Sequence, residues 1–148
     1  MEKPGFIVKF YDKAYEDKSI EELVKAPVAA ISGISKSDAA DLKKAFGIDT
    51  VEELANNEYV RLAQGINCFS ACSGEILDKA FESEEFENLA EKPVSAISGV
   101  SEEDAVLLKK AFGIDNIREF AENKYVAIAQ ATVALASLVH FLKDVGAV

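Results

Sequence analysis

The chain is poor in the residues that most often carry catalysis and redox chemistry. Its 148 residues include one histidine, two cysteines, three prolines and no tryptophan. A Ser/His/Asp triad would depend on the single histidine, His140, which lies in an apolar segment. The sequence holds no phosphate-binding loop and no zinc-protease motif. Its paired acidic residues are sequence neighbours rather than carboxylates that face each other. We therefore expect a protein that is not an enzyme and that needs no cofactor.

The two cysteines are too few and too close in sequence for a disulfide framework. Cys68 and Cys72 are spaced i, i+4, so a helix would place both on one face, and with His140 they form a candidate metal site. The simpler alternative is two buried thiols and a histidine with a structural role. The residues that align with the cysteines in the repeat described below, Ala134 and Leu138, are core types and favour this alternative.

Basic residues are scarce relative to acidic ones. The chain has 16 Lys and Arg against 26 Asp and Glu, which gives a formal net charge of −10 at pH 7. Such a surface repels nucleic acid and anionic membranes and attracts basic protein surfaces. The opening segment, MEKPGFIVKFYDK, is too charged for a secretory signal. We expect a cytoplasmic protein whose partner is a protein with a basic surface.

Residues 125–142, YVAIAQATVALASLVHFL, contain no Asp, Glu, Lys or Arg. This length is close to the minimum for a membrane-spanning helix. The polar residues within the segment favour a central buried helix instead, without a membrane partner. Its alanines make the helix slim, so that it can pack closely against another helix. We favour packing at the junction of the two halves over packing between two chains of a homo-oligomer.

What the sequence does contain is an internal repeat. Residues 27–64, PVAAISGISKSDAADLKKAFGIDTVEELANNEYVRLAQ, recur as residues 93–130, PVSAISGVSEEDAVLLKKAFGIDNIREFAENKYVAIAQ. No gap is needed, and most aligned positions are identical, which indicates a duplicated structural unit. Each unit is near the size at which a hydrophobic core becomes marginal. We divide the chain into units 1–73 and 74–148 and expect them to pack as one globular body, related by a twofold axis or by translation.

Local signals within each unit predict helices. Serine and threonine caps with an acidic residue three positions later begin helices, and glycines end them. A short run at residues 6–8 is the one segment that could form a strand. We therefore predict an all-α fold. The signals are Ser19 with Glu22, Gly33, Ser35 or Ser37, Gly47, and Thr50 with Glu53, and in the second unit Gly99, Gly113 and Asn116.

The string ISGISKSDAADLKKAFGIDTVEELA resembles the helix-hairpin-helix motif. The segments GIDTVEELA at 47–55 and GIDNIREFA at 113–121 further resemble the helical N-terminal domain of archaeal and eukaryotic RecA-like recombinases. The resemblance covers the hairpin and the following helix in each unit. It implies two tandem helix-hairpin-helix-like units. It also implies hairpin amides at a helix N-terminus that hold a DNA phosphate, with a basic residue nearby.

The sequence departs from this family at the hairpins. Ser35 and Ser101 stand where the family has its second hairpin glycine, and Glu102 and Glu103 beside the second hairpin would repel phosphate. Only the first hairpin could therefore bind nucleic acid. The lysine pair near the end of the next helix also has a simpler explanation, because cations there complement the helix dipole. The candidate phosphate contacts are Gly33, Ser35, Lys36, Ser37, Lys43 and Lys44.

These observations predict a non-catalytic protein-interaction or scaffold module built from two helix-hairpin-helix-like repeats. Nucleic-acid binding through the first hairpin is the alternative function. A small-ligand or metal carrier that uses Cys68, Cys72 and His140 is the second alternative.

Overall fold

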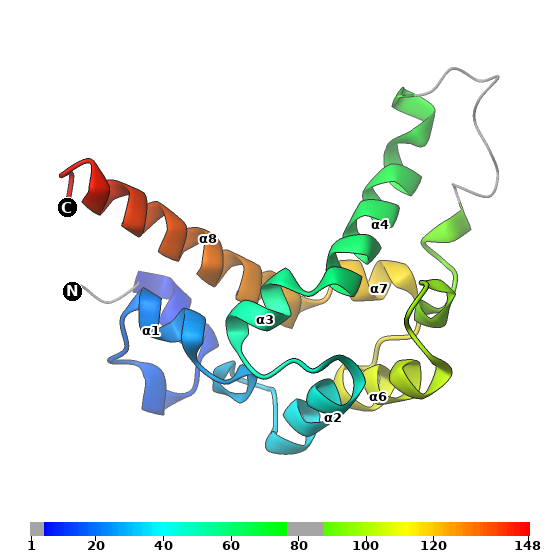
Figure 1. Cartoon of the computed structure of the whole chain (residues 1–148), viewed down its shortest axis with the longest axis horizontal. Helices are drawn as coiled ribbons and strands as arrows, with labels where there is room; N and C mark the ends of the chain where they lie inside the picture. Colours follow the sequence, from blue (N-terminus) through cyan, green and yellow to red (C-terminus); the bar gives the residue numbers. More distant parts are fainter. Residues whose placement is uncertain (1–4, 77–87) are drawn as a thin grey trace.

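The computed structural model describes residues 5–76 and 88–148, and this part of the chain is helical, with no named strand (Figure 1). The prediction of an all-α fold is confirmed. The first unit contains the 3₁₀ helices η1 (Gly5–Phe10), η2 (Lys13–Tyr15) and η3 (Val28–Ala30), and the α-helices α1 (Ile20–Lys25), α2 (Lys36–Phe46), α3 (Val51–Asn56) and α4 (Glu58–Ile76). The second contains η5 (Val94–Ala96), α6 (Glu102–Phe112), α7 (Ile117–Ala121) and α8 (Lys124–Asp144).

The structure contradicts the strand alternative at residues 6–8 and does not test the division of the chain at residue 73. Residues 6–8 lie in the 3₁₀ helix η1, so the strand alternative is wrong. The nearest extended contact is a single isolated bridge between Tyr11 and Ile31, which gives the run no strand to pair with. The division between residues 73 and 74 falls inside α4 and stays a prediction.

The helix ends follow the sequence signals. Gly47 and Gly113 end α2 and α6 in the left-handed conformation, with φ of 70° and 71°. The matching geometry 66 residues apart supports the interpretation of a duplicated unit. Reciprocal capping boxes join Ser19 to Glu22, Ser35 to Asp38, Thr50 to Glu53, Ser101 to Asp104 and Asn116 to Glu119.

The two units exchange their long helices. Helix α2 packs on α6, α4 packs on α7, and α8 packs on α3. The long helix of each unit therefore lies on the short helix of the other, which is the reciprocal relation of a twofold axis rather than of a translation. The slim helix 125–142, expected to pack at the junction of the two halves, lies there in α8, but it packs on α3 and not along the other long helix, and α2 and α6 share the interface.

Gln64 of α4 and Gln130 of α8 meet where the long helices cross. Each side-chain amide donates to the carbonyl oxygen of the other, over 2.8 and 2.9 Å. Gln64 also donates to the backbone carbonyl of Ala121, and Gln130 to that of Ala55. Beyond this crossing the two helices leave in different directions (Figure 1).

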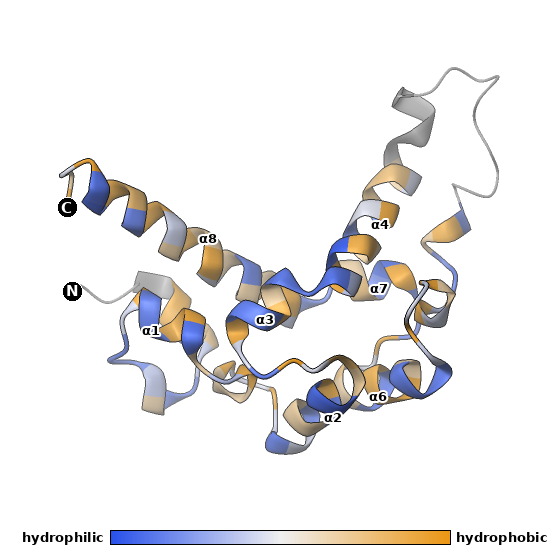
Figure 2. Cartoon of the chain, viewed as in Figure 1, coloured by the Kyte–Doolittle hydropathy of each residue, from blue (hydrophilic) through white to orange (hydrophobic). Residues whose placement is uncertain are grey.

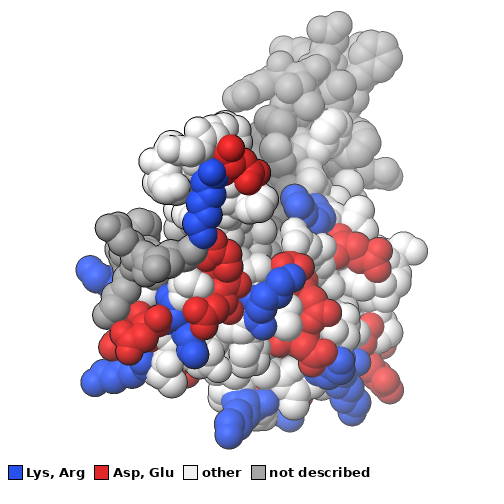
Figure 3. Space-filling model, turned by 60° about the vertical axis from the view of Figure 1, so that its left-hand side comes forward, with Lys and Arg blue, Asp and Glu red and all other residues white. Residues whose placement is uncertain are grey.

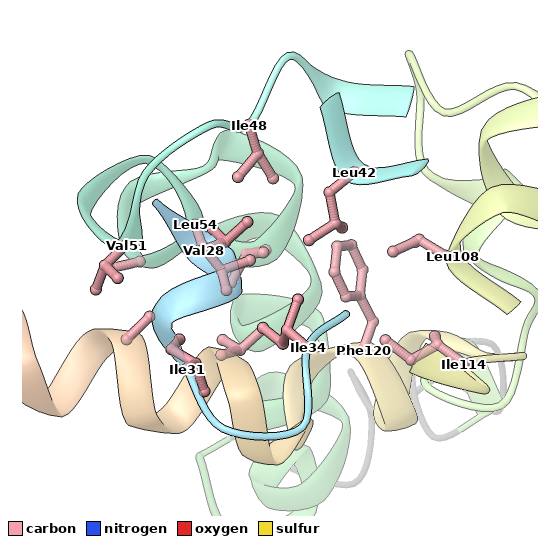
Figure 4. Packing of buried hydrophobic residues seen from close by; sticks show 14 of the residues in the cluster. Val28, Ile31, Ile34, Leu42, Ile48, Val51, Leu54, Leu108, Ile114 and Phe120 are labelled. Carbon is pink, nitrogen blue, oxygen red and sulfur yellow. The ribbon is translucent and has the colours of Figure 1, made fainter. Parts of the chain in front are cut away.

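One hydrophobic core extends through both units. The ring of Phe120 from α7 lies close to Leu42 of α2 and Leu108 of α6, and all three side chains are at most 1% exposed (Figure 4). Phe46 of α2 stacks on Phe120 with ring centroids 6.1 Å apart. Neither unit could leave the other without exposing these side chains.

Helix α8 is buried along one face only. Val126, Ala129 and Thr132 face the core, whereas Leu138 and Phe141 are 52% and 58% exposed. The expectation of a central buried helix is therefore wrong for its outer half, where α1 and η1 cover one face and the other face is exposed, and this half stays largely apolar (Figure 2). By length and composition alone, the helical stretch 117–144 could cross a membrane.

We predict that the Tyr11 hydroxyl limits stability at alkaline pH. Tyr11 is 4% exposed, and its hydroxyl lies 2.7 Å from that of Thr132, which itself donates to the carbonyl of Ile128. Burial raises the pKa of Tyr11 above its ordinary value of 10.0, and the hydrogen bond to Thr132 partly counteracts this. The folded state therefore favours protonated Tyr11, and its contribution is complete below pH 10 and is lost as the pH rises through the folded pKa.

Urea unfolding between pH 8 and pH 11 would measure this effect. The free energy of unfolding of the wild type should fall above pH 10, and the Tyr11→Phe variant should lose the part of this decline that comes from Tyr11. Equal slopes in the two proteins would contradict the assignment.

Candidate interaction surfaces at the hairpins and the α6 groove

Each hairpin glycine lies under a tyrosine of the other unit. Gly33 has φ of 100°, and a Cβ built there would lie 2.7 Å from the hydroxyl oxygen of Tyr125. Gly99 has φ of 95°, and the same 2.7 Å separates its Cβ position from the hydroxyl oxygen of Tyr59. Tyr125 also donates a hydrogen bond of 3.4 Å to the Gly33 carbonyl. The glycines thus serve packing between the units. This role was not predicted, although Tyr59 and Tyr125 occupy the same position in the two repeats.

The helix N-terminus after each hairpin already holds a carboxylate. The Asp38 carboxylate accepts from the Ser35 backbone amide over 3.1 Å, and the Ser35 hydroxyl accepts from the Asp38 amide over 3.0 Å. Ser101 and Asp104 make the same two bonds in the second unit. A helix N-terminus attracts anions through its free amides and dipole. Here an internal carboxylate already accepts from one of these amides and places negative charge at the helix N-terminus.

The six candidate phosphate contacts form two groups. Lys36 and Ser37 are exposed beside the first hairpin with Gly33 and Ser35. Lys43 and Lys44 lie roughly 10 Å further along α2, from the rise of about 1.5 Å per helical residue. Lys43 contacts Asp49 over 2.5 Å, and this hydrogen bond raises the pKa of the lysine. Lys109 and Asp115 repeat this pair in the second unit, so a cap for the helix end accounts for both.

Lys44 lines a groove that α2 shares with α6. This groove, the α6 groove, has a volume of about 500 Å³. Val106 is 65% exposed within it, next to exposed carboxylates at the start of α6. The groove is lined by Lys44, Glu102, Glu103, Asp104, Val106 and Leu107.

The two repeats differ in chemistry at the α6 groove. The hairpin glycines, the caps and the closing glycines are the same in both repeats or nearly so. At the groove, the first repeat has Lys36, Ser37, Ala40 and Asp41, and the second has Glu102, Glu103, Val106 and Leu107. At these positions the second repeat thus carries more negative charge and more apolar surface than the first.

The structure does not bring the candidate metal ligands together. Cys68 is exposed on α4, so the expectation of a buried thiol is wrong for it. His140 is exposed near the end of α8, 3.5 Å from Asp144. The two helices diverge beyond Gln64 and Gln130 (Figure 1). Among the described residues, no group of His, Cys, Asp or Glu could hold a metal ion. The side chain of Cys72 lies outside what the structure describes.

Comparison with known proteins bears on the first unit. Residues 21–65 match the family model described as a SAM-like helix-hairpin-helix tandem. Searches of curated proteins and of solved structures find no match. The resemblance to the helix-hairpin-helix motif is thereby confirmed for the segment from α1 to the first turns of α4, which includes the first hairpin.

We predict that Gly33→Ala lowers the free energy of unfolding by about 1–3 kcal/mol, because a Cβ would clash with the Tyr125 ring and alanine is strained at this φ. The matched control is Gly65→Ala on α4, where a Cβ would meet no atom within 4 Å. Alanine in a helix interior should stabilise this site by about 0.5–1 kcal/mol. Equal effects of the two substitutions in thermal or urea unfolding would show that Tyr125 does not pack on the hairpin.

Proposed function

We propose that this chain is a non-catalytic protein-interaction module built from two helix-hairpin-helix-like repeats. We further propose that it binds a partner with a basic, partly apolar surface through the α6 groove. The observation that carries this proposal is the groove itself, where exposed Val106 lies among three carboxylates at the start of α6.

The chemistry of the groove sets the chemistry of the partner. Lysine or arginine side chains would face Glu102 and Glu103, and an apolar side chain would cover Val106. Elsewhere, acidic and basic side chains are interspersed over the face that Figure 3 shows. Complementary charge around a small apolar centre gives an interface specificity and a fast association rate.

Nucleic-acid binding through the first hairpin stays the alternative function. The exposed Lys36 and the helix-hairpin-helix match of residues 21–65 favour it. Asp38 at the helix N-terminus and Tyr125 over Gly33 oppose it, because the carboxylate would repel a phosphate and already accepts from the Ser35 amide, and the tyrosine ring covers the hairpin glycine. The likeness to the recombinase N-terminal domain is a further part of this alternative and rests on the GIDTVEELA and GIDNIREFA strings.

The carrier alternative has little support among the described residues, because Cys68 and His140 lie on diverging helices. A cytoplasmic location and the lack of enzymatic activity remain parts of the proposal.

The experiment reverses the charge of the groove. Glu102→Lys with Glu103→Ser gives the second repeat the residues that the first repeat has at Lys36 and Ser37. We expect the tagged wild-type chain to capture basic proteins from a cell extract at low salt and the double variant to lose at least about tenfold of this binding. The captured proteins should elute as salt rises, since exposed charge pairs are screened.

The matched control is Asp12→Ser with Glu16→Lys, which changes the net charge by the same amount at exposed positions next to η2. It should retain the captured proteins. An equal loss in both variants would show that only the overall charge matters. Saturable binding of forked or single-stranded DNA in fluorescence anisotropy, removed by Lys36→Glu, would instead establish the alternative function.

A further inference from the structure

The outer part of α8 presents a row of apolar side chains that no described element covers. Their spacing alternates between four and three residues, which is the seam of a paired helix rather than of a helix on a flat surface. All are exposed, and Leu138, Phe141 and Val145 are 52%, 58% and 59% exposed. This row, the α8 stripe, consists of Ala127, Ala131, Ala134, Leu138 and Phe141 of α8 and of Val145, the residue directly after the helix.

Small and large residues divide the stripe into two halves. The half near the core carries only alanines, and the outer half carries only large side chains. If two such helices paired in parallel, Phe141 would meet Phe141 and the helices would splay apart over the alanines. In an antiparallel pair, one register places every large residue against an alanine. The facing residues are Leu138 and Ala134, Phe141 and Ala131, and Val145 and Ala127.

We propose that two copies of this chain pair through their α8 stripes, antiparallel, to form a twofold-symmetric homodimer. The stripe is complementary to itself in shape, which is the condition for an isologous interface. The proposal goes beyond the proposed function, because the α6 groove lies on a different element and stays open in the dimer.

The charges on α8 permit this pairing despite the acidic chain. The helix carries Lys124, Lys143 and Asp144 as its formal charges, none of which lies on the stripe. Lys143 already pairs with Glu21 over 3.0 Å, and Asp144 with His140. Apolar burial therefore drives the association, and the mutual repulsion of two chains of net charge −10 opposes it. Added salt screens this repulsion and should strengthen the dimer.

A membrane is a less suitable occupant for the same surface. The apolar segment 125–142 includes Val126 and Ala129, both 0% exposed in the core. Insertion across a bilayer would remove both from the fold, whereas a second copy covers the stripe and leaves the core intact.

The test is sedimentation equilibrium of the full chain, from about 1 to 100 μM, at low and high salt. The wild type should be a dimer in the upper part of this concentration range, and its dimerisation should become stronger as salt is added. Ala131→Phe would clash with Phe141 of the other copy, and Phe141→Ala would leave a cavity against Ala131 of the other copy. Each change should weaken dimerisation about tenfold or more. The double variant Ala131→Phe with Phe141→Ala should recover most of it, because the two facing positions exchange their sizes.

The matched control is Val106→Ala, which removes an exposed valine from the α6 groove and should leave dimerisation unchanged. The variants change exposed residues, so circular dichroism should show the same helicity in each. A wild type that stays monomeric at all concentrations would overturn the proposal, and so would a double variant that remains as weak as the single ones. A monomer that instead co-sediments with phosphatidylcholine vesicles would assign the stripe to a membrane. Because capture of basic proteins is measured with the groove variants, the two proposals can fail separately.

Discussion

The exchange of long helices between the two units is the contact on which the rest of the structure depends. A helical unit of this size has little interior of its own. Here α4 covers α7 and α8 covers α3, so that each unit completes the core of the other. The paired amides of Gln64 and Gln130 fix the register of this exchange, because a shift of either helix would leave polar groups without partners in a partly buried position.

The same exchange explains how the hairpins are used. Helices α4 and α8 place Tyr59 and Tyr125 on the hairpin glycines of the opposite unit. The hairpin backbone is thereby used for packing between the units, and the acidic residue at each helix N-terminus accepts a hydrogen bond from a hairpin amide. The positions free to diverge are those on the outside, at the start of α6 and along the outer half of α8. Both proposals about partners therefore concern surfaces that the exchange leaves uncovered.

Local signals predicted much of the fold. Caps such as Thr50 with Glu53 and the closing glycine at Gly47 depend on contacts within a few residues, so the sequence contains them directly. The exchange between units depends on contacts between residues far apart in the sequence, such as Gln64 with Ala121, 57 positions away, and with Gln130, 66 positions away, and local patterns could not distinguish it from a translation. For the same reason, the roles of Tyr59 and Tyr125 went unrecognised, although their identity in both repeats was the available signal. The apolar composition of α8 predicted burial, but composition alone does not show which face of a helix its neighbours cover.

Native-state amide hydrogen exchange tests the interdependence of the units most directly. Leu42 in α2 and Leu108 in α6 are the matching core positions, at most 1% exposed, on the two sides of the interface. If each unit completes the other, their amides should exchange only through global unfolding, with free energies of opening equal to within about 0.5 kcal/mol and to the value from urea unfolding. A lower free energy of opening at one of the two positions would show that one unit opens while the other stays folded, and would contradict a shared core.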